Sequence, residues 1–126
     1  MKKQLLASVL LTITATIASA ADWIPLALSD ESTLYVASDK VVRTGDTVAF
    51  WDKTVYSKSK KVGPYTVAYT VSKDELSCTE GKFRSLSSSI YSSAGEAVHT
   101  LGPTEWSDIP PDTMMDKVAA KLCSSS

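Results

Sequence analysis

The sequence has few of the side chains from which most enzyme sites are built. Its 126 residues include one histidine, His99, and two cysteines. A metal centre made from several histidines is therefore excluded, and the wide spacing of the cysteines excludes a C-x-x-C redox motif. The five glycines are scattered singly and form no phosphate-binding loop. We predict that the protein is not an enzyme and has no catalytic residue, cofactor or metal.

Weak matches to serine-enzyme motifs do not change this prediction. A Ser-His-Asp triad could use only His99, and the sequence contains no G-x-S-x-G segment. Ser57 and Lys60 have the spacing of a serine-lysine pair but lack its companion motifs. His99 is more typical of an exposed strand residue, so an enzyme that uses it is the third and weakest hypothesis.

The sequence also has no long apolar run beyond its N-terminus. Residues 1–20 start with Met1-Lys2-Lys3, continue as an apolar segment and end in Ala18-Ser19-Ala20, which fits a signal-peptide cleavage site. We expect residues 1–20 to be a cleaved signal peptide and residues 21–126 to form the exported domain. An uncleaved anchor over residues 4–21 is the alternative, but this segment is short for a span and is interrupted by threonines.

No charge of one sign dominates the expected mature chain, which keeps 11 basic and 14 acidic side chains. This balance excludes a chain-wide basic field for nucleic acid or anionic membranes. Ala21 and Asp22 follow the expected cleavage site, so the cysteine of a lipoprotein signal is missing. We therefore expect a periplasmic or secreted protein with no nucleic-acid partner and no membrane span after cleavage.

The two cysteines, Cys78 and Cys123, are expected to form a disulfide because both of these compartments are oxidising. Two separate free thiols are the alternative. The bridge would connect the strand-rich part of the chain to its C-terminal end.

Alternating apolar and polar residues predict strands over most of residues 23–101. The clearest is 65–72, where tyrosine and valine alternate with smaller, more polar residues. Residues 47–51 are apolar on both faces, as in a central strand.

Short connections between these segments predict antiparallel pairing. Residues 34–37 and 41–43 are expected to form one tight hairpin, and residues 83–91 and 96–101 a second. About six strands result, and their connections are too short for a crossover helix.

The strongest helix signal lies near the C-terminus. Pro110-Pro111 end the extended chain, Asp112 or Thr113 can cap a helix, and apolar residues recur at helical spacing over 115–122. Such a short helix is marginal alone. We predict an α+β fold, a single antiparallel sheet of about six strands with a C-terminal helix packed on one face and held by one disulfide.

Two features favour binding. Lys58, Lys60 and Lys61 form a small cationic segment, expected as a polar loop that ends at Gly63-Pro64, which could contact polyanionic glycans or acidic proteins. An ordinary solvated loop is the alternative. The second feature is the sheet, because an uncovered edge invites pairing with a second copy or a peptide.

Short motifs along the chain match those of one known family. They are Trp23, Arg43-Thr44-Gly45 before a strand that ends at Trp51, Cys78 with Phe83-Arg84-Ser85-Leu86, Tyr91 before Gly95, the run Trp106-Ser107-Asp108-Ile109-Pro110-Pro111-Asp112-Thr113, and the closing Cys123. In these features the sequence resembles the surface-adhesin protein E family of small exported bacterial proteins. The resemblance implies a sheet of about six antiparallel strands, a disulfide-linked helix on its concave side, and pairing through the sheets as a homodimer.

The family's named member is a lipid-anchored adhesin that binds host extracellular-matrix proteins. This sequence departs from it in lacking the lipid-attachment cysteine and in having Ser77 where an acidic residue is expected. The first hypothesis is an exported non-enzymatic binding protein that recognises a host matrix protein or glycan of unknown identity. The alternative is a periplasmic interaction module, either an inhibitor or an envelope-assembly partner.

Overall fold

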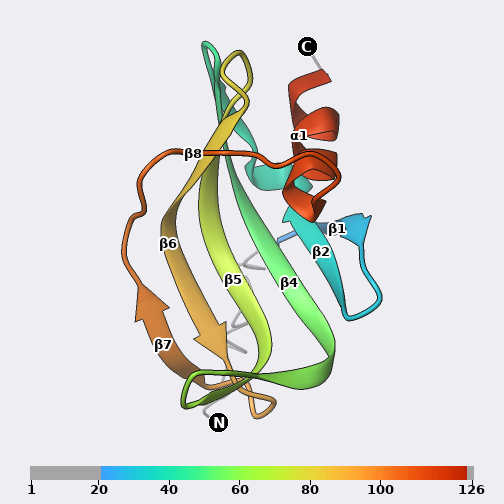
Figure 1. Cartoon of the computed structure of the whole chain (residues 1–126), viewed down its shortest axis with the longest axis vertical. Helices are drawn as coiled ribbons and strands as arrows, with labels where there is room; N and C mark the ends of the chain where they lie inside the picture. The colour runs from blue at the N-terminus through green and yellow to red at the C-terminus, as the bar shows by residue number, and fades with distance from the viewer. Residues whose placement is uncertain (1–20, 125–126) are drawn as a thin grey trace, which may run out of the picture.

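Residues 21–124 are described by a computed structural model, which Figure 1 shows. The expected signal peptide, residues 1–20, lies outside the described residues, and its cleavage stays a prediction. Within residues 21–124, no helix is both long enough and apolar enough to cross a membrane.

All strands of the described chain belong to one antiparallel sheet. The elements are β1 (Trp23–Leu28), β2 (Ser32–Ala37), the 3-10 helix η1 (Ser38–Lys40), β3 (Val42–Thr44), β4 (Thr47–Val62), β5 (Tyr65–Ser77), β6 (Lys82–Tyr91), β7 (Ala97–Leu101), β8 (Ser107–Asp108) and α1 (Met114–Ser124). Six strands follow one path, β1-β2-β4-β5-β6-β7, while β3 pairs with β4 and β8 with β6. The predicted fold class is confirmed, with eight strands in place of about six because the short β3 and β8 also pair with strands of this path.

The predicted hairpin between residues 34–37 and 41–43 is wrong. β2 is already paired on both sides, with β1 and with the middle of β4, so it has no free edge for β3. The chain passes through η1, and β3 folds back on the start of β4. Gly45, at a φ of 59°, makes the turn between these two strands, a conformation that favours glycine.

The long β4–β5 hairpin places the three lysines in a strand, not in the expected loop. Lys58, Lys60 and Lys61 lie in the distal part of β4, and the tight turn follows at Gly63, whose φ is 58°. The pairing register slips between Val55 and Lys60. This stretch has no apolar alternation, so backbone pairing extends the strand where side-chain periodicity gives no signal.

Helix α1 and the chain leading to it from β8 lie against one face of the sheet (Figure 1). Val118 and Leu122 of α1 are buried in the core, together with residues of β1, β2, β4 and β5. Those core residues are Ala27, Leu34, Val36, Val48, Phe50 and Leu76. Burial of this apolar surface stabilises a helix that would be marginal alone.

Both ends of α1 are fixed by specific contacts. Thr113, one of the two predicted caps, accepts a hydrogen bond from the backbone N–H of Asp116 at 3.2 Å. At the other end the Cys78–Cys123 disulfide joins the helix to the end of β5, with the two Cα atoms 5.6 Å apart. The Arg43 guanidinium also donates to the carbonyl of Leu122. The helix is therefore attached to the sheet at its C-terminal end.

Candidate functional site

A surface groove of about 400 Å³ lies between the β1–β2 turn and the distal part of β4. We call it the lysine groove. It is lined by Asp30, Glu31, Tyr56, Ser57, Lys58, Ser59 and Lys60. Two lysines and two carboxylates therefore share one concave surface with a tyrosine ring and two hydroxyls.

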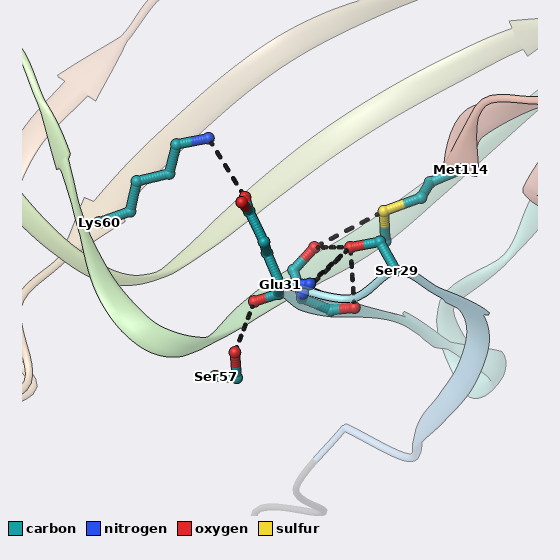
Figure 2. A network of polar contacts seen from close by, with 6 residues as sticks. Ser29, Glu31, Ser57, Lys60 and Met114 are labelled. Carbon is teal, nitrogen blue, oxygen red and sulfur yellow. Dashed lines mark hydrogen bonds and ion pairs between the residues drawn. The ribbon is translucent and has the colours of Figure 1, made fainter.

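The β1–β2 turn at one side of the groove is held by a serine network, which Figure 2 shows. The Ser29 hydroxyl accepts hydrogen bonds from the backbone N–H groups of Glu31, at 3.3 Å, and Ser32, at 3.1 Å. The Ser32 hydroxyl lies 3.0 Å from that of Ser29 and contacts the Met114 sulfur at 3.6 Å. The turn is thus connected to the first residue of α1.

The two sides of the groove are joined at Glu31. Its carbonyl accepts hydrogen bonds from the Ser57 backbone N–H, at 2.8 Å, and the Ser57 hydroxyl, at 3.1 Å. Its carboxylate lies 4.0 Å from the Lys60 ammonium (Figure 2). The same ammonium is 5.7 Å from the Tyr56 ring centroid. Because both charged side chains are more than half exposed, this ion pair contributes less than about 1 kcal/mol. Glu31 therefore holds the Lys60 ammonium only weakly.

Sequence reasoning identified only part of this surface. Lys58 and Lys60 line the groove, whereas Lys61, the next residue along the strand, does not. Asp30, Glu31 and Tyr56 were missed, because nothing in the sequence predicts which turn lies beside the distal part of β4. The role of the lysines in ligand contact stays a prediction.

A second group of residues lies on the sheet face opposite α1. We call it the outer aromatic face and define it as Trp23, Tyr35, Trp51, Lys53, Tyr69 and Lys73. Tyr35 is paired with Lys53 across β2 and β4, and Trp51 with Lys73 across β4 and β5. Val36 and Phe50, the sequence neighbours of Tyr35 and Trp51, belong to the core on the helix side.

Basic side chains of this face lie over aromatic rings. The Lys53 ammonium is 4.8 Å from the Tyr69 ring centroid and 5.9 Å from that of Trp23. The Lys73 ammonium is 6.0 Å from the Trp51 ring centroid. The Tyr69 ring also stacks on Tyr91, with centroids 4.7 Å apart. Sequence reasoning missed this arrangement, although the alternation in residues 65–72 already placed Tyr69 on one face of its strand.

Two carboxyl groups are buried on the helix side of the same strands. Asp52 and Asp74 are 4% and 3% exposed, and Asp74 accepts a hydrogen bond from the Ser85 hydroxyl at 2.7 Å. One Asp52 oxygen, Oδ2, has no hydrogen-bond partner among the described residues. Burial, and then the neighbouring Asp74 carboxyl, raises the pKa of Asp52 well above its usual range. Asp52 therefore holds its proton at a higher pH than an exposed aspartate does.

His99, the residue of the enzyme hypothesis, has no carboxylate partner in the part of the chain that the structure describes. His99 is exposed, stacks on Tyr65 and has its Nδ1 atom 3.5 Å from that tyrosine's hydroxyl. Ser57 donates to the Glu31 carbonyl and Lys60 pairs with the Glu31 carboxylate. Within residues 21–124, no group of three or more His, Cys, Asp or Glu side chains could hold a metal ion.

Comparison with known proteins identifies both a family and a fold. The family model of surface-adhesin protein E matches residues 23–124. The structure of Haemophilus influenzae protein E is similar, with a TM-score of 0.57 and 17% identity over 81% of this chain and 83% of that chain. Its crystal form II has a TM-score of 0.55 and 14% identity over 84% of this chain and 97% of that chain. At this identity the likeness concerns the fold. No curated protein sequence matches the chain.

Proposed function

The chain belongs to the surface-adhesin protein E family, and we propose that it is an exported, non-enzymatic binding protein that recognises a host matrix protein or glycan. The family description supports an adhesin-like role. The lysine groove supports the choice of this part of the surface as the binding site. A concave surface with a few converging polar groups is the usual form of a recognition site.

The chemistry of the groove favours a ligand with acidic groups. Lys58 lines it without an ion pair to any described residue, and Lys60 has an exposed ion pair with Glu31 and a contact with the Tyr56 ring. The Tyr56 ring adds an apolar surface with a polar end, as is frequent in interfaces. The groove can therefore take a carboxylate or sulfate of a matrix component and hold its apolar part on the tyrosine.

Export is part of this proposal. A structural disulfide persists in oxidising compartments and is rare in the cytosol, so the Cys78–Cys123 bridge supports a protein beyond the inner membrane. We propose cleavage after residue 20, a domain formed by residues 21–126, and release into the periplasm or the medium. Pairing through the sheets, which the family resemblance implies, stays a prediction.

The proposal is tested with the exported form of the protein on immobilised matrix proteins. Lys58→Gln with Lys60→Gln is expected to lower the affinity at least tenfold, because both groove cations are lost. Lys61→Gln with Lys82→Gln is the matched control, since it removes the same charge from outside the groove. Equal losses in the two double variants would show a non-specific charge effect and would contradict the proposal.

Fractionation of the host cell separates this function from the alternative. Protein at the cell surface or in the medium can meet a host matrix. Protein found only in the periplasm cannot, and the same groove would then serve an inhibitor or an envelope-assembly partner. That second outcome would overturn host recognition.

A further inference from the structure

We propose that the outer aromatic face binds an acidic saccharide, with Lys53 and Lys73 taking its carboxylate or sulfate groups and the aromatic rings holding its sugar faces. This inference rests on the proposed function, whose ligand class it names, but it places the saccharide away from the lysine groove.

Within residues 21–124, neither of the two lysines has a carboxylate partner. Lys53 contacts the rings of Trp23 and Tyr69, and Lys73 contacts the ring of Trp51. Neither makes an ion pair with another described residue, whereas Arg84 on the same face pairs with Glu75 at 3.1 Å. A face with two uncompensated ammonium groups repels a cationic ligand and attracts an anionic one.

The spacing of these ammonium groups suits a chain of repeated acidic units. Lys53 is paired with Val71, and Lys73 lies two residues further along β5, so the two lysines are diagonal neighbours on one face. Diagonal neighbours in an antiparallel pair lie about 7–8 Å apart, and long side chains can spread or converge from there. One oligosaccharide can therefore present acidic groups to both lysines.

The surroundings of Lys53 form a shallow depression of about 180 Å³ lined by Trp23, Tyr35, Lys53 and Val55. Aromatic ring faces carry partial negative charge and a large apolar surface, and the C–H bonds of a sugar ring pack against such faces. Next to Val71 and Lys73, the paired β6 residues are Ser89 and Ser87, whose hydroxyls suit sugar hydroxyls. The face thus combines rings, cations and hydroxyls.

Two other occupants fit this surface less well. An acidic peptide that binds a sheet uses backbone hydrogen bonds at an edge, but Lys53 and Lys73 lie on the central strands β4 and β5, whose backbones are already paired. A second copy placed symmetrically on this face would bring the same lysines against each other. Like charges at such a contact weaken it.

The test titrates the exported form of the protein with a heparin-derived hexasaccharide, followed by calorimetry and tryptophan fluorescence. Trp23 and Trp51 lie beside the two lysines, so binding should change the emission. Lys53→Gln with Lys73→Gln is expected to weaken binding at least tenfold. Lys58→Gln with Lys60→Gln, an equal charge change on the groove, should alter it less than twofold. Circular dichroism checks that each variant is folded.

Each outcome decides the inference. Binding of the hexasaccharide but not of neutral maltohexaose, with loss only in the Lys53 and Lys73 variant, supports it. Equal binding of hexaglutamate, loss only in the groove variant, or a dimer in sedimentation that buries this face would overturn it. If no saccharide binds while matrix proteins are still bound through Lys58 and Lys60, this inference fails and the proposed function stands.

Discussion

Replacing both cysteines, Cys78→Ser with Cys123→Ser, tests how much the link between sheet and helix contributes to stability. The disulfide joins residues 45 positions apart in the sequence. In the chain-entropy model, a closed loop of this length removes about 13 cal/mol/K from the unfolded chain, or about 4 kcal/mol at 25 °C. A domain of this size has a free energy of unfolding of about 5–15 kcal/mol, so the loss is a large part of the total.

The local contacts indicate which part of the molecule should respond. Without the bridge, α1 keeps the buried side chains of Val118 and Leu122 and the contact of Arg43 with the last turn. Burial of two such apolar side chains contributes about 1.5–3 kcal/mol each. We therefore expect the variant to fold, with α1 as its least protected element.

Urea unfolding followed by circular dichroism measures the effect. With a denaturant slope of about 1–3 kcal/mol/M, a loss of 4 kcal/mol lowers the unfolding midpoint by more than about 1 M. Wild-type protein treated with a reducing agent is the control and should unfold at a similar urea concentration. A loss below about 1 kcal/mol, with an unchanged slope, would refute the reasoning that the closed loop dominates.

Two further variants test buried and capping contacts. The Asp52→Asn variant should gain stability relative to the wild type as the pH rises. The pKa of Asp52 is raised in the folded state, so the wild type loses free energy of unfolding as the pH increases from the ordinary aspartate pKa, about 3.9, to the raised value. Asp39→Asn is the control in pH-dependent unfolding, because the backbone N–H of Asp22 lowers the pKa of Asp39 and the pH effect on stability should have the opposite sign. A stability difference between Asp52→Asn and wild type that does not change with pH would contradict the buried pair. Thr113→Ala should cost about 1 kcal/mol in thermal or urea unfolding, because the N–H of Asp116 loses its acceptor, and no loss would show that the cap is dispensable.

The parts of the fold that were predicted correctly are those with a local signal in the sequence. Residues 65–72 alternate strictly, and β5 includes all of them. Thr113 stands before a helical apolar pattern, and α1 begins at Met114. The bridge between Cys78 and Cys123 followed from the small number of cysteines and the expected compartment. Each of these features depends on neighbouring residues or on composition.

The parts that were missed depend on which segments meet in space. β3 has three exposed residues, and its partner is decided by the part of the β4 edge that β2 leaves free. The groove needs Glu31 to meet Ser57, which continues the β2–β4 register one residue beyond the Ser32–Tyr56 pair and has no local signal. Part of the outer aromatic face could be predicted from the sequence, because Trp51 and Lys53 alternate with buried residues. The pairing of Trp51 with Lys73 could not be predicted in this way.

Strand β4 explains why the two proposed binding surfaces can be tested separately. Up to Val55 its residues alternate strictly, so Phe50 enters the core while Trp51 and Lys53 lie on the outer face. After Val55 the register slips, and Lys58 and Lys60 line a groove formed with a different turn. Lys58 and Lys60 therefore lie on β4, whereas Lys53 and Lys73 lie on β4 and β5, and the two lysine pairs share no described contact. Their effects on binding should be independent, because residues without common partners usually give additive free-energy changes. A quadruple variant combines the two double variants. If its fold loss in affinity differs from the product of the fold losses of the two double variants, one ligand spans both surfaces.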